Sequence, residues 1–204
     1  MQLINIEKAG LVIDDRVYDK MIYEYRIKKE KRKSEVYGGV MGVRTDLGTV
    51  GNDLWSNTHV FIRPLKTESD LIYAAYDCQL DDKQKELVNP AWYSIGRAYL
   101  FREDNYPCII YDEQMTPIGF INLCKWLGEG DAYTWSFYID KSHQGKGYGK
   151  SAAEAAVRLL KAANPDKPIK LATEKDNIKA QCLYQSLGFC LLPELDGDDI
   201  VFGL

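Results

Sequence analysis

Several features that often reveal what a protein does are missing from this sequence. The 204-residue chain has five cysteines, an odd number, and none of them forms a C-x-x-C pair. Its only histidines, His59 and His143, lie far apart in the sequence. We therefore expect reduced thiols in a cytoplasmic protein, and neither a metal site nor a Cys–His catalytic centre.

Long apolar runs and charge of one sign are also lacking. No segment approaches the roughly 18 apolar residues of a membrane span, and the N-terminal M-Q-L-I-N-I-E-K lacks the pattern of a signal peptide. The net charge of −4 does not indicate a nucleic-acid-binding protein. A hydrophobic content of 46% is ordinary for a globular chain, and the length suits one domain with an appendage.

What the chain does have is a glycine-rich stretch between an apolar segment and a helical one. Residues 135–139 are aromatic or β-branched apart from one serine, which predicts a buried strand. Residues 151–163 are nearly all strong helix formers. Between them lie Gly145, Gly147 and Gly149, so the stretch predicts a strand, a tight turn and a helix.

A glycine-rich turn at the start of a helix is suited to binding an anion. The first backbone N–H groups of a helix have no partner within it, and the helix dipole adds positive potential there. Glycines allow a phosphate to approach the backbone, while Lys146 and Lys150 add charge. We expect a phosphate or pyrophosphate over residues 144–150, which include Tyr148.

Two common phosphate-binding motifs do not fit this turn. A P-loop requires glycine where Gln144 stands, and the three glycines have the wrong spacing for a dinucleotide-binding fingerprint. Gln144, Gly147 and Gly149 instead match Q/R-x-x-G-x-G, the pyrophosphate loop of the GNAT N-acetyltransferase family, which this chain resembles.

A second signature lies downstream of the glycine-rich turn. The segment N-I-K-A-Q-C-L-Y-Q-S-L-G-F resembles the family pattern N-x-x-A-x-x-x-Y-x-x-x-G-F. Asn177, Ala180 and Tyr184 would share one face of a helix over residues 177–187. The two signatures occur in the family's order, with room for one helix and one strand between them.

The resemblance implies the GNAT fold, an α/β (α+β) domain with a mixed, mostly antiparallel sheet and helices on both faces. We expect this domain over residues 58–204, preceded by an N-terminal extension over residues 1–57 whose role is unknown. In the extension, Val17, Met21 and Tyr25 predict a helix that ends in the basic run 28–33. The expected strands are 59–63, 107–111, 118–126, 132–139, 168–172, 190–192 and 200–202. The expected helices run from Thr67 or Ser69 through Tyr76, over 86–101 with an interruption near Pro90, and over 151–163 and 177–187.

The resemblance also implies acetyl-CoA as the acyl donor. Its pantetheine arm would bind the backbone of the strand before the loop, and Tyr184 would be the general acid for the leaving thiolate. Many relatives carry a glutamate on that strand where Trp135 stands here, so the general base is open between Glu129, Glu174 and a water chain. The residues expected to bind the cofactor are Phe137, Tyr138, Ile139, Gln144, Gly145, Lys146, Gly147, Tyr148, Gly149, Lys150 and Asn177.

The acceptor is expected to be a small amine. Segments such as L-V-N-P-A-W-Y-S-I-G-R-A-Y resemble the bacterial spermine/spermidine acetyltransferases. A polyamine site needs carboxylates and aromatic faces, and the candidates are Asp77, Asp81, Asp82, Glu86, Tyr93 and Trp126. An antibiotic amine, a protein N-terminus and a non-catalytic acetyl-CoA-binding module are the alternatives. Many relatives dimerise, which makes a homodimer a plausible partner state.

Overall fold

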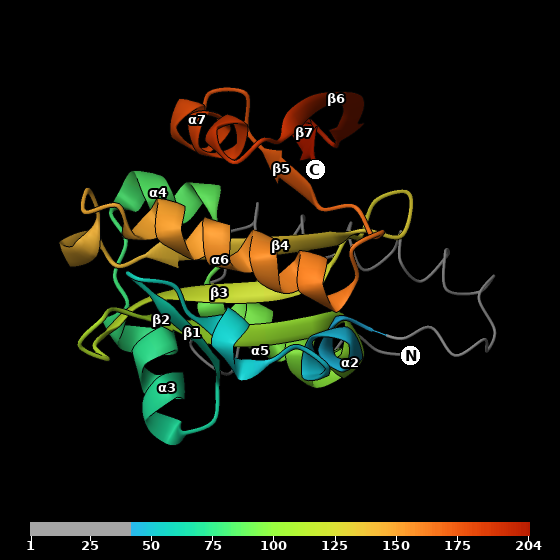
Figure 1. The fold of residues 1–204 in the computed structure, drawn as a ribbon. Helices are drawn as coiled ribbons and strands as arrows, with labels where there is room; N and C mark the ends of the chain where they lie inside the picture. Colours follow the sequence, from blue (N-terminus) through green and yellow to red (C-terminus); the bar gives the residue numbers. More distant parts are fainter. Residues whose placement is uncertain (1–41) are drawn as a thin grey trace, which may run out of the picture. The chain divides into compact units, whose positions relative to one another are not determined.

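The computed structural model describes residues 42–204, and the basic-ended helix expected in the N-terminal extension lies outside them (Figure 1). The compact unit that contains these residues begins at Met41. It therefore starts well before residue 58, where the sequence predicts the domain boundary.

Two antiparallel sheets form the framework. The first has the order β1-β2-β3-β4 and consists of β1 (Phe61–Pro64), β2 (Asn105–Tyr111), β3 (Pro117–Lys125) and β4 (Tyr133–Ile139). The second has the order β5-β7-β6 and consists of β5 (Lys170–Thr173), β6 (Cys190–Asp196) and β7 (Asp199–Gly203). One parallel bridge, from Tyr133 to Ile169, connects the two sheets within the described residues.

Helices cover both faces of the first sheet, which confirms the expected fold class. The helices are α2 (Val43–Gly48), α3 (Glu68–Ile72), α4 (Asp82–Leu87), α5 (Ala91–Leu100), α6 (Tyr148–Ala163) and α7 (Ile178–Ser186). A π-helical turn, Tyr73–Asp77, continues α3. Short 3-10 turns occupy Asn52–Trp55, Arg102–Asp104 and Lys141–His143.

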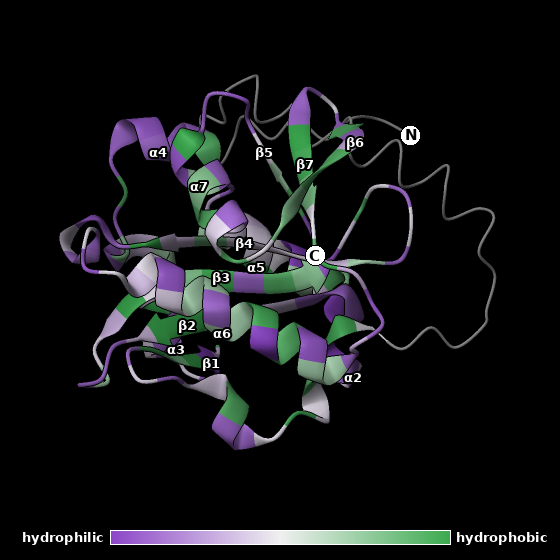
Figure 2. Ribbon diagram, turned by 45° about the horizontal axis from the view of Figure 1, so that its top comes forward, coloured by the Kyte–Doolittle hydropathy of each residue, from purple (hydrophilic) through white to green (hydrophobic). Residues whose placement is uncertain are grey.

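The alternation of side chains along the strands explains the two helical layers. In β2, Cys108 and Ile110 face the larger core with α2 and α6, whereas Ile109 and Tyr111 face a smaller core with α5 and the π-helical turn. Successive residues of a strand point to opposite faces, so a run of apolar residues serves both layers. Figure 2 shows this sheet as largely hydrophobic.

Most element boundaries follow the sequence prediction, with shifts that have local causes. The helix expected over 86–101 is two helices, α4 and α5, because Pro90 has extended backbone and caps the second. Helix α3 begins at Glu68, since Thr67 and Asp70 form a capping box. Helix α6 begins at Tyr148, earlier than expected, with Gly147 as its cap.

Residues 43–57 pack on the domain. Val43 and Leu47 of α2 are 1% exposed, and Trp55 is 8% exposed in the same core as α6. The Arg158 side chain of α6 donates to the Ser56 carbonyl at 2.5 Å. The glycines of this stretch obscure its periodicity, which is why the sequence suggested a separate extension here.

A buried polar cluster fastens α2 to the strands. The Tyr133 hydroxyl donates to Asp46 Oδ2 at 2.5 Å, and Lys167 Nζ lies 3.8 Å from the same oxygen. Lys167 also lies over the Tyr133 ring and pairs with Asp131 at 3.1 Å. All three members of this contact, Asp46, Tyr133 and Lys167, are at least nine-tenths buried.

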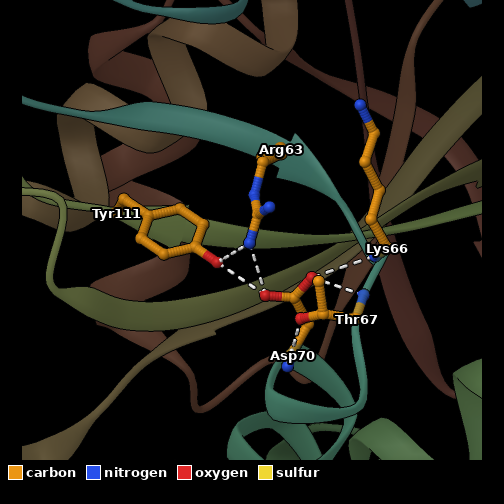
Figure 3. A network of polar contacts seen from close by, with 5 residues as sticks. All are labelled: Arg63, Lys66, Thr67, Asp70 and Tyr111. Atoms are coloured by element: carbon orange, nitrogen blue, oxygen red, sulfur yellow. Dashed lines mark hydrogen bonds and ion pairs between the residues drawn. The ribbon is translucent and has the colours of Figure 1, made fainter.

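A second network attaches the start of α3 to β1 and β2 (Figure 3). Asp70, 4% exposed, accepts hydrogen bonds from Arg63, from the Tyr111 hydroxyl and from the backbone N–H groups of Lys66 and Thr67. Burial alone would raise the pKa of the Asp70 carboxyl, but these hydrogen bonds outweigh it and lower the pKa below its usual value. Asp70 is therefore held as a carboxylate.

Among the described helices, none is both long and apolar enough to cross a membrane.

Candidate active site

The first feature of the site is an edge of β4 that, beyond one bridge, no other strand of residues 42–204 pairs with. The backbone N–H of Tyr133 donates to the Pro168 carbonyl beside β5, at 2.9 Å, whereas the N–H of Asp140 donates back to Ile118 of β3. Since backbone groups alternate between the two edges of a strand, those of Phe137 and the N–H of Ile139 face β5. Strand β5, however, pairs with β7 and diverges from β4 after the single bridge (Figure 1).

The gap between β4 and β5 therefore leaves the backbone groups of Phe137 and the N–H of Ile139 outside the strand pairing. The sequence predicts that these two residues bind a pantetheine arm. Tyr138 differs from its two neighbours. Its backbone faces β3, and its ring packs on Phe120 at 5.8 Å in the core on the α5 side. Burial raises the pKa of the Tyr138 hydroxyl.

The glycine-rich loop follows directly from this edge. Gly145 has φ +75° and Gly147 has φ +87°, left-handed values that other residues adopt only with strain. Gly149 has no such requirement, and a Cβ there would lie 3.9 Å from Ile139. Lys146 is exposed, and Lys150 lies 4.0 Å from Glu154 across an exposed turn of α6. The loop and the α6 N-terminus together have the backbone geometry that suits an anion.

Gln144 is held in place by its side chain. Its Nε2 donates to the Ile139 carbonyl at 2.8 Å, and its amide forms a reciprocal pair with Gln84 of α4, with both bonds at 2.9 Å. Sequence reasoning missed Gln84, because no short-range signal links residues sixty positions apart.

Tyr148 and Asn177, two other residues expected to bind the cofactor, lie at the starts of α6 and α7. Tyr148 is half-buried, and neighbouring Glu113 and Asp112 contribute, after burial, to a raised pKa of its hydroxyl. Asn177 caps α7, where its side-chain oxygen accepts from the Ala180 N–H at 3.2 Å. Asn177 therefore sets the start of the helix that bears Tyr184.

Tyr184 lies on α7 within an aromatic cluster. Its ring is 6.0 Å from Phe189 and 5.7 Å from Phe202, measured between centroids. Burial raises the pKa of its hydroxyl to about 12. A free thiol has a pKa near 8.5, so full proton transfer from this tyrosine to a thiolate is uphill. The hydroxyl stays protonated at neutral pH and is suited to donating a hydrogen bond to developing negative charge.

Trp135 occupies the strand position where many relatives carry a carboxylate. It is 7% exposed and packs edge-on against Phe189 at 5.8 Å, so it supports the aromatic cluster of Tyr184. An indole cannot remove a proton from an amine. A general base in this protein must come from another residue or from water.

The two candidate bases lie at opposite ends of the strands. Glu129 is exposed and precedes β4, whereas the glycine-rich loop follows β4. The length of the strand, about 20 Å, therefore separates Glu129 from the loop. Glu174 is exposed and follows β5, which runs parallel to β4 at their bridge. Glu174 is therefore at the same end as the glycine-rich loop.

The four carboxylates expected to bind the acceptor are exposed and clustered in sequence at the π-helical turn and α4. They are Asp77, Asp81, Asp82 and Glu86. Asp82 pairs with Lys85 at 2.9 Å, and this contact, with a smaller contribution from Lys141, lowers the pKa of the Asp82 carboxyl. The ring of Tyr93 in α5 lies under Arg97, whose guanidinium carbon is 5.9 Å from the ring centroid.

Trp126 lies apart from these carboxylates. It is 7% exposed in a small cluster with Ala132 and Val201, and its backbone N–H donates to the Ala132 carbonyl just before β4. The structure therefore puts Trp126 at the end of β4 that is remote from the loop. It contributes no aromatic face to an acceptor site on α4.

No cluster of three or more potential metal-ligating side chains is found over residues 42–204. The five cysteines are all free thiols. Burial raises the pKa of Cys78 to about 12, and it also raises that of Cys108. Neither thiol is suited to nucleophilic catalysis at neutral pH.

Comparisons with known proteins agree with this geometry. A spermine/spermidine N(1)-acetyltransferase of Bacillus subtilis is 42% identical over 60 residues, which are 29% of this chain and 40% of that protein. The chain thus matches two-fifths of the length of that curated relative. The crystal structure of spermidine N-acetyltransferase from Vibrio cholerae, in complex with CoA and spermine, superposes with a TM-score of 0.56. It is 17% identical, and the match covers 72% of this chain and 94% of that one.

An acetyltransferase from Agrobacterium tumefaciens superposes equally well, with a TM-score of 0.56 at 15% identity over 84% of this chain and 98% of the other. At these identities the solved structures establish the fold. The model of the acetyltransferase (GNAT) family matches residues 70–189, more than half of the chain. With both signature motifs at the gap between β4 and β5, the protein belongs to the GNAT family of acetyltransferases.

Proposed function

We propose that this protein is a cytoplasmic N-acetyltransferase that transfers the acetyl group of acetyl-CoA to a primary amine of a polyamine such as spermidine or spermine. The observation that supports this most strongly is the unpaired edge of β4, which leads at Ile139 into a loop with two left-handed glycines at the start of α6. An arm with amide groups and a pyrophosphate fit these two features in succession.

In the proposed reaction the neutral amine attacks the thioester carbonyl directly. A C–N bond forms, the C–S bond breaks, and CoA leaves as the thiolate. The β4 N–H groups that face the gap can polarise the carbonyl oxygen. Tyr184 donates a hydrogen bond to the departing sulfur, and the proton of the amine leaves through water or through Glu174.

A polyamine is supported by the chemistry of α4 and the turn before it. Asp77, Asp81 and Glu86 are exposed carboxylates, and Tyr76 beside Asp77 is 73% exposed. Carboxylates and exposed aromatic faces both attract ammonium groups. The similarity to the Bacillus subtilis enzyme, although it covers two-fifths of that protein, supports the same substrate class.

The buried Trp135 favours one other reading, a module that binds acetyl-CoA without catalysis, because a strand carboxylate is missing. Thiol release from acetyl-CoA by the purified protein separates the two. The acceptors should be spermidine, spermine, putrescine, a lysine peptide and an aminoglycoside. Saturable release highest with spermidine or spermine is the expected result. Release only with the peptide or the aminoglycoside would contradict the substrate, and binding without release would contradict catalysis.

A further inference from the structure

Helix α4 has almost no buried anchor of its own. None of its six residues is buried, and its first turn lacks a side-chain cap. Figure 2 shows it as mostly hydrophilic. Its apolar neighbours Leu80 and Val88 pack in the smaller core at either end. Isolated helices shorter than about 12 residues are marginal in water, so the polar contacts of α4 matter for its position.

Those contacts lead to one place, the turn between β4 and α6. The Gln79 N–H donates to Asp140 Oδ2 at 2.6 Å, and the Lys141 N–H donates to the Gln79 carbonyl at 2.8 Å. Within α4 itself, Gln84 forms the reciprocal amide pair with Gln144. The segment before α4 and α4 itself are therefore fastened to the residues that begin the glycine-rich loop.

The Gln84–Gln144 amide pair links the position of α4 to the position of the loop residue Gln144. Each primary amide offers both a donor and an acceptor, so a face-to-face pair satisfies both groups and fixes their relative orientation. Gln144 uses its second N–H for the Ile139 carbonyl, the last residue of β4. The position of Gln84 is thus set by the strand edge and by the loop at once.

We propose that the Gln84–Gln144 pair couples the CoA loop to the acceptor side of the site. In this view, CoA binding over residues 144–150 restrains Gln144, and Gln144 in turn orders α4 with the carboxylates Asp81, Asp82 and Glu86. The amine site is completed when CoA is bound. By linkage, the amine strengthens CoA binding by the same factor. Gln84 is a positioning residue, and the inference rests on the proposed function because it takes the loop as the CoA site.

The test is hydrogen exchange of the full-length protein with and without saturating CoA, in three forms. Gln84→Met keeps the side-chain length and helix propensity but removes both amide bonds. Lys83→Ala changes an exposed neighbour on the same helix and is the matched control. Thermal melting of each variant checks that the fold is unaffected.

We expect CoA to slow exchange in both α6 and α4 of the wild type and of Lys83→Ala, by roughly fivefold or more in α4, on the scale of typical coupling between sites. In Gln84→Met, α6 should still be protected and α4 should not. The coupling would be overturned if CoA protected α6 alone in the wild type, or if it protected α4 in Gln84→Met as strongly as in the wild type. Either result would leave the proposed function standing. If calorimetry detects no CoA binding, the proposed function fails, and the coupling fails with it.

Discussion

Helices α6 and α4 both contact the turn after β4, yet they are built in opposite ways. Helix α6 has sixteen residues, of which seven are buried against the sheet, whereas α4 has six residues and none buried. The proposed donor half of the site, made by β4, the loop and α6, is therefore set by the core. The proposed acceptor half, at α4, depends on flanking residues and hydrogen bonds. The two proposed halves therefore differ in how firmly the rest of the domain holds them.

The largest expected effect on stability concerns Asp70, which attaches the start of α3 to β1 and β2. Asp70→Asn removes a buried carboxylate from Arg63 and should lower the free energy of unfolding by about 3–5 kcal/mol. The matched control, Asp82→Asn on α4, breaks an exposed pair and should leave the free energy of unfolding nearly unchanged. Denaturant unfolding at pH 7 measures both. Equal losses would mean that the buried Asp70–Arg63 contact stabilises the fold no more than the exposed Asp82–Lys85 contact.

The Asp70 effect should also depend on pH. The folded-state pKa of this carboxyl is lowered, so its contribution is present above the unfolded pKa of about 3.9 and disappears as the pH falls through the folded value. The difference between wild type and Asp70→Asn should therefore shrink below about pH 4. A difference that stays constant down to pH 2 would argue against a charged Asp70.

Tyr184→Phe, on α7, tests the proposed hydrogen bond to the departing sulfur. We expect kcat to fall by roughly 10- to 1000-fold, on the scale of general-acid catalysis, while the KM for acetyl-CoA stays unchanged. Because the pKa of Tyr184 is raised to about 12, the wild-type rate should show no loss from its ionisation up to about pH 10. A kcat within twofold of wild type would remove Tyr184 from the mechanism.

Gly147→Ala and Gly149→Ala distinguish two reasons for a glycine in the loop, a left-handed backbone and close approach of a CoA phosphate. Gly147 has φ +87°, so alanine there should cost about 1–3 kcal/mol of stability and weaken CoA binding. Alanine at Gly149 fits the protein, 3.9 Å from Ile139, so it should leave stability within about 0.5 kcal/mol and weaken only CoA binding. Calorimetric binding and thermal melting of both variants distinguish the two causes. Unchanged CoA affinity in both would show that the anion site lies elsewhere.

The smallest effect is expected in the acceptor half. Glu86→Gln removes one exposed carboxylate and should raise the KM for spermidine about two- to fivefold, with kcat nearly unchanged, since exposed charges interact weakly. The effect should fade as salt is added. Steady-state kinetics at two ionic strengths measure it. An effect on kcat alone would indicate that Glu86 acts in the chemical step.

Local patterns in the sequence predicted the donor half well. The strand, the glycine-rich turn and α6 follow from residues close in sequence, and Gly145 and Gly147 have the left-handed backbone that glycine permits. Of the two caps that the sequence predicts for α3, Thr67 and Ser69, the structure has Thr67. The divergence of β4 from β5 leaves backbone groups of the strand before the loop outside strand pairing, and the resemblance to the family implies that a pantetheine arm binds that strand.

The acceptor half and the start of the domain were harder to predict because they depend on distant contacts. Trp126 is an aromatic residue next to a strand end. The residues around it in the sequence do not reveal that it packs with Val201 rather than near α4. The Gln84–Gln144 pair joins two polar residues that carry no pattern of their own. Residues 43–57 look like a loop because their glycines interrupt an apolar spacing that becomes visible only when α6 is beside it.

The cluster of Asp46, Tyr133 and Lys167 limits how far the chain can be shortened. A protein that began at residue 58 would leave the Tyr133 hydroxyl without its acceptor. Of the two carboxylates that pair with Lys167, it would keep only Asp131, which is 55% exposed. It would also uncover the core surface on which Val43, Leu47 and Trp55 pack, at about 1.5–3 kcal/mol for each large side chain. A shortened protein that keeps this core should therefore begin at or before Met41.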